Sequence, residues 1–420
     1  MSDLEPLLDW LWTAGPPAEV EDKAREMLLD TLGCVLASSR RARLRSFADR
    51  LSAGAVRVPG FAKALAPADA AALFAAAACW DEACEGLARA HGRPGVPVIA
   101  ACAALAQARS ATLGELLDGL VVGYESGGRF GEAIRMQPGM HVDATWPGLG
   151  VAVAAVRLGG GSATQAAAAV RIAACQMPRS LFLAAAAGAE ARNTYLAHAA
   201  QLGLLAAQAA LAGFSAPQGA LEAIGAGPLA APGTWVILES YLKPFAAVRH
   251  VHYAAASGLA LFPRVRGRIG EIARLELATY AEALTYCGNR APRNAIQAQF
   301  SLSYGLANAL ARGSLDPDAY EDAALAEAQV RELERKVELV EDRALTEAGR
   351  RGARLRIVLG GETLEASVSQ VEGDPSFPMR RDAVVHKFAR YSGRAERDAR
   401  EFLAASDTTP LAEALRRLAG

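Results

Sequence analysis

Five stretches of this chain consist almost entirely of alanine, leucine, valine and glycine, and each is as long as a helix. They fall near residues 68–79, 95–108, 148–158, 163–177 and 195–212. A helix that is apolar all round is buried all round, so these stretches predict the centre of a many-layered helical domain. Their small residues allow neighbouring backbones to approach closely.

The apolar stretches do not predict a membrane span. Arg157, Arg171 and the polar run 193–201 interrupt the longest of them, so none offers a clean span of about 20 residues. Lys and Arg total 44 and Asp and Glu 45, a balance that argues against nucleic acid or an anionic membrane as the main partner. The first residues lack a basic signal region, and the six cysteines form no C-x-x-C pair. We therefore expect a cytoplasmic protein with buried, reduced thiols.

Two amphipathic helices are predicted in the first third of the chain. Residues 19–37 carry an apolar stripe at helical spacing, and Pro17 stands at the entrance, where a missing N–H costs least. Thr112, three residues before Glu115, predicts a capping box at the start of the second helix.

The pattern changes near residue 265. Residues 272–280 alternate in part as a half-buried strand does, and residues 355–368 predict a hairpin that turns at Gly360 and Gly361. An apolar stripe from Val330 to Val340 predicts a further helix. The predicted fold class is mainly α, with a large all-α domain at residues 1–240 and 378–420 and a smaller α+β lid domain at residues 241–377.

Common cofactor and hydrolase motifs are missing from the sequence. The glycines at 159–161 do not open a G-x-G-x-x-G frame and predict a turn between helices. There is no P-loop and no G-x-S-x-G. The pair His250-x-His252 has no further ligands at suitable spacing. We expect neither a metal nor a cofactor.

Polar groups gather instead in islands within the apolar stretches. The islands are Asp81–Glu85 with His91, Gly139–Thr145 with His141, Lys243–His252, and Ala298–Ala307. Burying such groups without partners would cost a few kcal/mol each. If they are buried, they must pair with one another, with water or with a ligand.

Six short motifs follow one another along most of the chain. They are Leu29-Asp30-Thr31-Leu32-Gly33-Cys34, Gly123-Tyr124-Glu125, Gly213-Phe214-Ser215-Ala216-Pro217, Lys243-Pro244-Phe245, Phe300–Tyr304 and Lys387-Phe388. In this order they resemble the MmgE/PrpD family, which includes 2-methylcitrate dehydratase, cis-aconitate decarboxylase and iminodisuccinate epimerase. The resemblance implies a helical domain with an α+β lid, an active site in the cleft between them, and a homodimer.

The resemblance also implies site residues, carried over position by position. The catalytic candidates are Asp81, His91, His141, Lys243 and Tyr304. The substrate-binding candidates are Arg192, Arg249, Glu85 and His252, together with Thr145, which follows His141 by about one helical turn.

The sequence departs from the family pattern at several of these positions. The usual D-F-D-D-T is here Asp81-Glu82-Ala83-Cys84-Glu85, and the usual His-Pro-Ser begins His91-Gly92-Arg93. Arg192, at a position where many members have lysine, can hold a carboxylate but cannot act as an acid or base. Glu85 would repel a substrate carboxylate and would suit an amine or imine. These departures favour a divergent member.

The implied chemistry is cofactor-independent proton transfer at a carbon next to a carboxylate of a small di- or tricarboxylate or related acid. Loss of water or CO₂ would make the protein a lyase, and reprotonation of an imino- or amino-dicarboxylate would make it an epimerase. One fixed charge donor in such a site contributes about 3 kcal/mol, and Lys243, Arg192 and Arg249 are the candidates. His141 is the first candidate for proton transfer, because imidazole titrates near neutral pH.

Structural alternatives stand beside these roles. A histidine or Thr145 can cap a helix, Asp81 can be an N-cap, and Tyr304 can be a core residue with one hydrogen bond. The whole chain can also be a non-catalytic binding relative that kept the fold.

Overall fold

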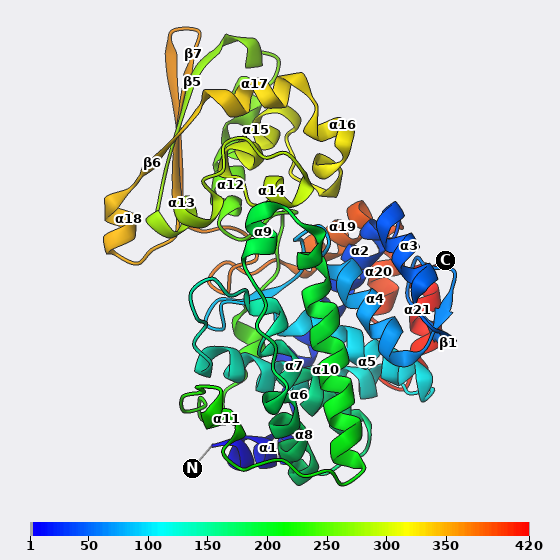
Figure 1. The fold of residues 1–420 in the computed structure, drawn as a ribbon. Helices are drawn as coiled ribbons and strands as arrows, with labels where there is room; N and C mark the ends of the chain where they lie inside the picture. The colour runs from blue at the N-terminus through cyan, green and yellow to red at the C-terminus, as the bar shows by residue number, and fades with distance from the viewer. Residues whose placement is uncertain (1–2, 420) are drawn as a thin grey trace.

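The structure, a computed structural model, describes residues 3–419, which form a helical body and a smaller α+β lid (Figure 1). The body contains α1 (Leu4–Thr13), α2 (Ala18–Ser38), α3 (Ala42–Arg50), α4 (Pro67–Cys79), α5 (Gly95–Ala108), α6 (Leu113–Ala133), α7 (Pro147–Leu158), α8 (Ala163–Cys175), α9 (Leu183–Ala187), α10 (Tyr195–Leu211) and α11 (Ala220–Ala223). Short strand pairs β1 (Ala53–Arg57) with β2 (Ala64–Leu65), and β3 (Gly86–Leu87) with β4 (Ser240–Tyr241), join its loops. The mainly α, two-part fold class predicted from the sequence is confirmed.

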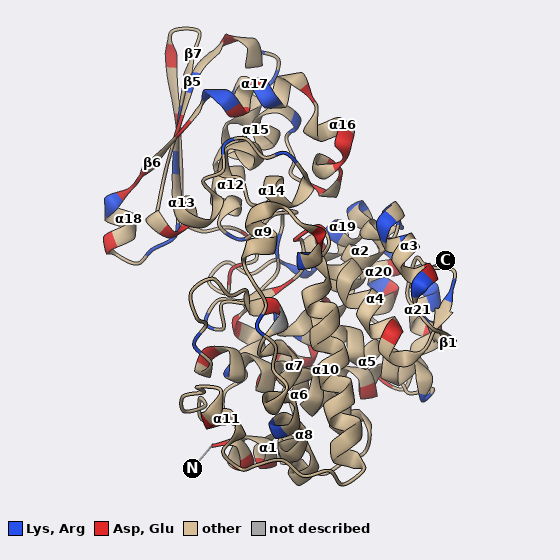
Figure 2. Cartoon of the chain, in the orientation of Figure 1, with Lys and Arg blue, Asp and Glu red and all other residues tan. Residues whose placement is uncertain are grey.

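The alanine-rich helices occupy the centre of the body. Helix α7 packs against α6 and α10, and α4 packs against α5 and α10. Residues 70–79 of α4 are all buried. In Figure 2 these helices carry few charges, whereas Lys, Arg, Asp and Glu mark the outer helices and the lid. The predicted helices at these five stretches are confirmed, as is the capping box at Thr112 and Glu115.

Glycine allows α6 and α7 to meet backbone to backbone. A Cβ atom placed on Gly150 of α7 would lie 2.6 Å from the carbonyl oxygen of Gly123 and 2.8 Å from the Cα of Gly127, both on α6. The backbone atoms at this crossing have no flexible end that can move aside. The predicted close packing of small residues is therefore present at this crossing.

We expect Gly150→Ala to lower the free energy of unfolding by about 1–3 kcal/mol, because overpacking outweighs the better helix propensity of alanine. Urea unfolding followed by circular dichroism measures the change. Gly270→Ala is the control, since a Cβ there meets nothing within 4 Å. Equal stability of the two variants would show that the α6–α7 crossing has room to relax.

The lid follows the body in the chain. It contains α12 (Val251–Val265), β5 (Ile272–Thr279), α13 (Ala281–Cys287), α14 (Ala295–Gln299), α15 (Leu302–Arg312), α16 (Asp322–Leu325), α17 (Ala328–Lys336), β6 (Val337–Glu341), α18 (Arg343–Glu347), β7 (Ala353–Leu359) and β8 (Glu362–Val368). Its sheet has the order β6-β5-β7-β8, with β5 and β6 parallel and the other pairs antiparallel. Helix α12 packs against α15, β7 and β8.

The hairpin of β7 and β8 is confirmed, and the helix predicted from Val330 to Val340 is corrected. Gly360 and Gly361 turn the hairpin with φ of 54° and 84°, which suits glycine. Helix α17 ends at Lys336, and Val337 begins β6, which pairs in parallel with β5 from Leu275 onward. The apolar spacing was right for the first part, but pairing with β5 draws the second part into the sheet.

Helices α19 (Arg381–Ser392), α20 (Glu396–Leu403) and α21 (Leu411–Ala419) return to the body (Figure 1). Helix α19 lies along α2, where the Lys387 ammonium donates to Asp30 at 2.6 Å in a buried pair. The domain bounds drawn from the sequence at residues 240 and 378 stay a prediction.

No helix between residues 3 and 419 combines the length and apolar character that a membrane crossing needs. All six cysteines are free, and five are buried as expected. The exception is Cys175, which is exposed at the last residue of α8.

Candidate active site

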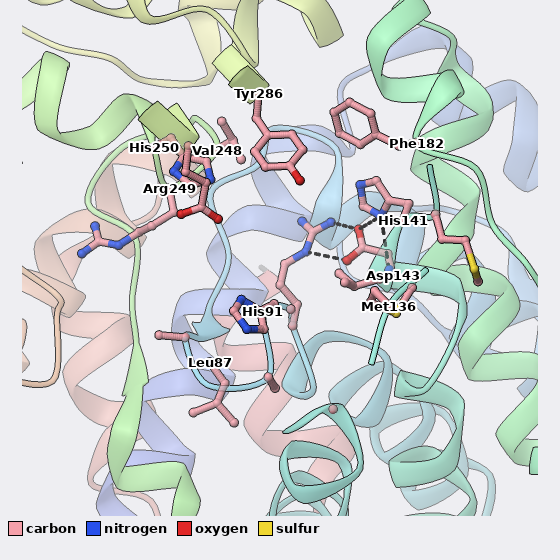
Figure 3. A pocket seen from close by; sticks show the side chains of 18 of the residues that line it. Leu87, His91, Met136, His141, Asp143, Phe182, Val248, Arg249, His250 and Tyr286 are labelled. Atoms are coloured by element: carbon pink, nitrogen blue, oxygen red, sulfur yellow. Dashed lines mark hydrogen bonds and ion pairs between the residues drawn. The ribbon is translucent and has the colours of Figure 1, made fainter. Parts of the chain in front are cut away.

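Residues from the polar islands of the body line a cavity of about 740 Å³, and residues of the lid also line it. Three loops of the body form one side: the α4–α5 loop, the α6–α7 loop and the segment before α12. Helix α13 of the lid contributes Tyr286 to the opposite wall (Figure 3). Segments far apart in the chain therefore meet around one cavity.

A buried carboxylate at Glu82 stands at the floor of the cavity. It accepts a hydrogen bond from Lys243 Nζ at 2.7 Å and forms ion pairs with Arg93, at 3.1 Å, and with Arg192. All these side chains are at most 6% exposed. One carboxylate therefore binds three cationic groups. Asp143 also pairs with Arg93, so these cations exceed the two carboxylates by one positive charge.

Lys243 is held where its proton can move near neutral pH. Its ammonium also donates to the Glu82 carbonyl oxygen at 2.9 Å. Burial and then the charge of Arg93 lower the pKa of Lys243 to about 7, although Cys84 and Asp143 act to raise it. An ordinary surface lysine would stay protonated at this pH. Lys243 can therefore act as an acid or a base, which a permanently charged arginine cannot.

Asp143 links Arg93 to His141. It forms an ion pair with Arg93, and its backbone N–H donates to His141 Nδ1 at 3.2 Å. Burial lowers the pKa of His141, although the Asp143 charge opposes this, so the ring is neutral at pH 7. Burial acts to raise the pKa of Asp143, but the charge of Arg93, together with its hydrogen bond and the nearby His141 and Lys243, lowers that pKa below its usual value.

This hydrogen bond sets the tautomer of His141. Because Nδ1 accepts, the hydrogen of the neutral ring is assigned to Nε2. Figure 3 shows the far side of the ring turned into the cavity, toward Tyr286 and Phe182. In this state His141 offers a donor to a bound oxygen.

The backbone is strained at two cavity residues. Glu82 and His91 both have a φ of 53°, in the left-handed region that non-glycine residues rarely adopt. Such a conformation costs about 1–3 kcal/mol and occurs frequently at functional sites. It turns the Glu82 side chain inward and places His91 at the exposed rim.

Aromatic contacts and an ion pair hold the cavity residues that lie just before α12. Arg249 forms an ion pair with Asp374 and lies over the Tyr241 ring, 5.0 Å from its centroid. His250 Nδ1 is 2.6 Å from the Tyr280 hydroxyl. Burial and the nearby arginines lower the pKa of His250 to about 3, so this histidine is neutral at pH 7.

Four residues expected from the sequence line the cavity: His91, His141, Lys243 and Arg249. Their catalytic and binding roles stay predictions. The other six do not line it, and each is placed by other contacts.

Asp81 and Glu85 lie in the same loop as Glu82 but point elsewhere. Asp81 is buried and pairs with Arg41 at 3.2 Å, on the side away from the cavity lining. Glu85 is buried and accepts hydrogen bonds from the backbone N–H groups of Gly95 and Val96, at 2.9 and 3.0 Å. It therefore caps the N-terminus of α5, and its expected contact with a substrate amine is corrected.

Arg192 and His252 stand behind residues of the cavity. The Arg192 guanidinium pairs with Glu82 and donates to Asn193 Oδ1 at 2.8 Å. Burial lowers the pKa of His252 well below its usual value. Its Nε2 atom lies 3.0 Å from the carbonyl oxygen of Ala247. Arg192 therefore positions the carboxylate, and His252 supports the turn before α12.

Tyr304 and Thr145 have the structural roles left open above. The Tyr304 hydroxyl donates to the Ala319 carbonyl oxygen at 2.6 Å inside the lid, and the ring is buried. The Thr145 hydroxyl donates to the Val142 carbonyl oxygen at 2.6 Å. Neither residue lines the cavity, and their expected roles toward a substrate stay predictions.

The capping role of Glu85 predicts a stability effect. We expect Glu85→Ala to lower the free energy of unfolding by about 2–4 kcal/mol, because two buried N–H groups lose their acceptor. Glu85→Gln keeps an acceptor oxygen and serves as the matched variant, with a loss of about 1 kcal/mol or less. Thermal unfolding monitors both. If Glu85→Gln keeps its stability but binds substrate more weakly, Glu85 contacts the substrate.

Sequence reasoning missed several residues of the site. Glu82, Arg93 and Asp143 each stand beside a predicted residue, in the same polar islands. His250 was considered as half of a metal pair, and Tyr286 gave no signal because it lies outside every island. The density of polar residues in an island was informative, but it did not say which of them face inward.

Within the described part of the chain, no three His, Cys, Asp or Glu side chains are grouped so that they could hold a metal ion. His250 and His252 are each engaged by other groups, at Tyr280 and Ala247. The cations of the cavity could hold an anionic ligand.

Comparisons with known proteins agree with this arrangement. The model of the MmgE/PrpD N-terminal domain matches residues 11–227, and that of the MmgE/PrpD C-terminal domain matches residues 245–409, which include α19 and α20. No curated protein matches the chain significantly. The chain therefore belongs to the MmgE/PrpD family, a family of dehydratase- and lyase-type enzymes.

Proposed function

We propose that the protein is a cofactor-independent lyase, a dehydratase or decarboxylase, that transfers a proton at a carbon next to a carboxylate. The substrate class expected for the family is a small di- or tricarboxylate or a related acid. The observation that carries the proposal is Lys243, a buried amine at the cavity floor between Glu82 and Arg93, with a pKa lowered to about 7.

The cations at the floor suit the anion that the reaction forms. Proton loss beside a carboxylate builds negative charge on that carbon and its carboxylate. The Arg93 guanidinium is buried and held by Glu82 and Asp143, so it is already oriented when the charge develops. Phe182, Phe300 and Tyr241 line the same cavity and reduce the access of water.

Lys243 alone can carry out both proton transfers of a dehydration. Its neutral amine takes the hydrogen from the carbon as a proton, and the C–H electron pair forms the new double bond. The C–O bond to the neighbouring carbon breaks, and the leaving hydroxide takes a proton from the Lys243 ammonium. Water leaves, and the amine is neutral again. In a decarboxylation the C–C bond to the leaving CO₂ breaks, its electron pair takes a proton from the Lys243 ammonium, and the amine regains that proton from solvent water.

The alternative is an epimerase, and His141 is the observation that favours it. Inversion requires a second proton donor, and His141 turns its Nε2 side into the cavity (Figure 3). The group that returns the proton would then differ from the group that removed it. A homodimer is the assembly expected from the family resemblance, and the reduced cysteines favour a cytoplasmic location.

Incubation with candidate acids in D₂O tests the proposal. A dehydratase forms the unsaturated acid and places deuterium next to the carboxylate when the reaction runs in reverse. A decarboxylase releases CO₂ and places deuterium on the carbon that lost it. NMR and mass spectrometry follow both. Exchange with inversion and no release indicates the epimerase. No exchange into any di-, tri- or monocarboxylate would contradict both and favour a binding relative.

The pH dependence follows from Lys243. Dehydration starts from the neutral amine, which is protonated below its pKa of about 7, so we expect kcat/KM for dehydration to rise with pH through a limb at about pH 7. The lowered pKa of His141 keeps its ring neutral across this range. A pH–rate profile measures the limb. An activity that falls as pH rises through 7 would show that the ammonium is the required form.

A further inference from the structure

The cavity has more room than a small di- or tricarboxylate needs. Since a water molecule takes up about 30 Å³ of liquid, 740 Å³ holds about 25 non-hydrogen atoms. A small di- or tricarboxylate has roughly 8 to 14, so it fills about a third to a half of that space. The remaining space can hold a larger substrate or solvent water.

The cations of the cavity already have carboxylate partners. Arg93 and Lys243 share Glu82, Arg249 pairs with Asp374, and Arg351 lies 3.6 Å from Glu282. Within residues 3–419, Arg135 is the lining cation without a carboxylate partner, and it is exposed at the rim. At the floor, Arg93, Arg192 and Lys243 share two carboxylates, Glu82 and Asp143, so one positive charge is left for a substrate carboxylate. A second or third substrate carboxylate would enter without a free cation, at a cost in desolvation. One substrate carboxylate therefore fits better than two or three.

One wall of the cavity is built of rings. We call Phe182, His250, Tyr286 and Phe300 the aromatic wall. Tyr286 lies with its ring centroid 5.5 Å from that of Phe182, edge to face, and 6.0 Å from that of His250, stacked. Phe300 follows at 6.4 Å from Phe182.

The aromatic wall starts beside the proton-transfer groups and ends at the opening. The His141 ring stacks at 6.2 Å on Phe182, and Figure 3 shows Tyr286 and Phe182 side by side above His141. Tyr286 is 47% exposed, although it lies between other rings. A large ring left open inside a cavity is typical of a surface that an apolar ligand covers.

We propose that the substrate carries a single carboxylate at the Lys243–Arg93 floor and an apolar or aromatic arm that lies on the aromatic wall. This inference rests on the proposed function and narrows its substrate class. It replaces the second and third carboxylates of the family's expected substrates by an arm of matching size. His250 is neutral at neutral pH, so the wall adds no full charge that would favour an anionic arm.

Two matched pairs of acids test the arm. Succinate and 3-phenylpropanoate share a CH₂–CH₂–carboxylate unit and differ only in carboxylate against phenyl. We expect 3-phenylpropanoate to bind with a Kd at least tenfold lower by titration calorimetry. Malate and 3-hydroxy-3-phenylpropanoate form the corresponding reactive pair, and the phenyl member should have a kcat/KM at least tenfold higher for dehydration.

Substitutions on the wall connect the preference to its residues. Phe182→Ala should raise the Kd of 3-phenylpropanoate at least tenfold and that of succinate by a smaller factor. Phe214→Ala, at an exposed phenylalanine outside the lining, is the control and should change neither Kd. Unchanged 3-phenylpropanoate binding in the Phe182 variant overturns the assignment of the arm to the wall.

The outcomes separate this inference from the proposed function. Succinate or malate binding as tightly as its phenyl partner, with deuterium exchange, overturns the inference and leaves the lyase standing. Binding of 3-phenylpropanoate through Phe182 without deuterium exchange into any acid supports the inference and contradicts the lyase. If 3-phenylpropanoate does not bind, the inference is overturned.

Discussion

Replacing Lys243 by arginine is expected to lower kcat by about 10²–10⁴-fold, the contribution of one positioned acid or base. Arginine keeps the positive charge next to Glu82, so the ion pair survives. It does not release its proton in the working pH range. The variant therefore removes proton transfer and keeps the electrostatics, and steady-state kinetics together with a substrate Kd separates the two.

Lys387→Arg is the matched control for this experiment. Lys387 is also a buried lysine with a carboxylate partner, Asp30, but it lies between α2 and α19, outside the cavity lining. Its substitution should change the melting temperature more than the kcat of the folded enzyme. The residual activity of Lys243→Arg should also lack the limb at about pH 7. Full activity in Lys243→Arg would show that another group, and not Lys243, transfers the proton.

Glu82→Gln is expected to lower the free energy of unfolding by about 3–5 kcal/mol, because breaking a buried pair leaves charge uncompensated. Here the loss leaves Arg93, Arg192 and Lys243 together without their shared carboxylate. The same repulsion favours the neutral amine, so the acid limb of kcat/KM should move to lower pH. Urea unfolding and a pH–rate profile measure the two effects.

Glu321→Gln provides the comparison for Glu82. Glu321 also pairs with an arginine, Arg41, but its side chain is 60% exposed, so its loss should cost at most about 1 kcal/mol. Glu82→Asp keeps the charge and should recover part of the stability. If Glu82→Gln is as stable as the parent, the cations are hydrated in solution, and the carboxylate does not organise the site.

Much of the fold was predictable because local patterns agreed with the tertiary structure. Apolar residues on every side of a helix leave only a buried position, and α4, α5, α7 and α10 take it. The hairpin at Gly360 and Gly361 was predictable because its turn needs positive φ at both residues. The segment from Val337 was not, because a spacing that fits a helix was overruled by pairing with β5.

The candidate site was predictable as a set of islands and only partly as residues. Lys243 and His141 could be identified because their islands and the family resemblance pointed to them. The sequence could not distinguish Glu85 and Thr145 from residues that line the cavity, because the same polar side chains cap helices and bind ligands. Tyr286 comes from the lid and joins the cavity only through tertiary packing.

The sequence by itself determined that a buried helical body carries a mixed lid, and that a few polar islands must be satisfied inside it. Only the tertiary structure decided that Glu82, and not its neighbours Asp81 and Glu85, pairs with Arg93, Arg192 and Lys243. In a loop outside regular structure, the direction of each side chain depends on its own backbone angles, and the positive φ of Glu82 turns it inward. No repeating pattern records such an angle, because it is set by the surroundings that the folded chain supplies.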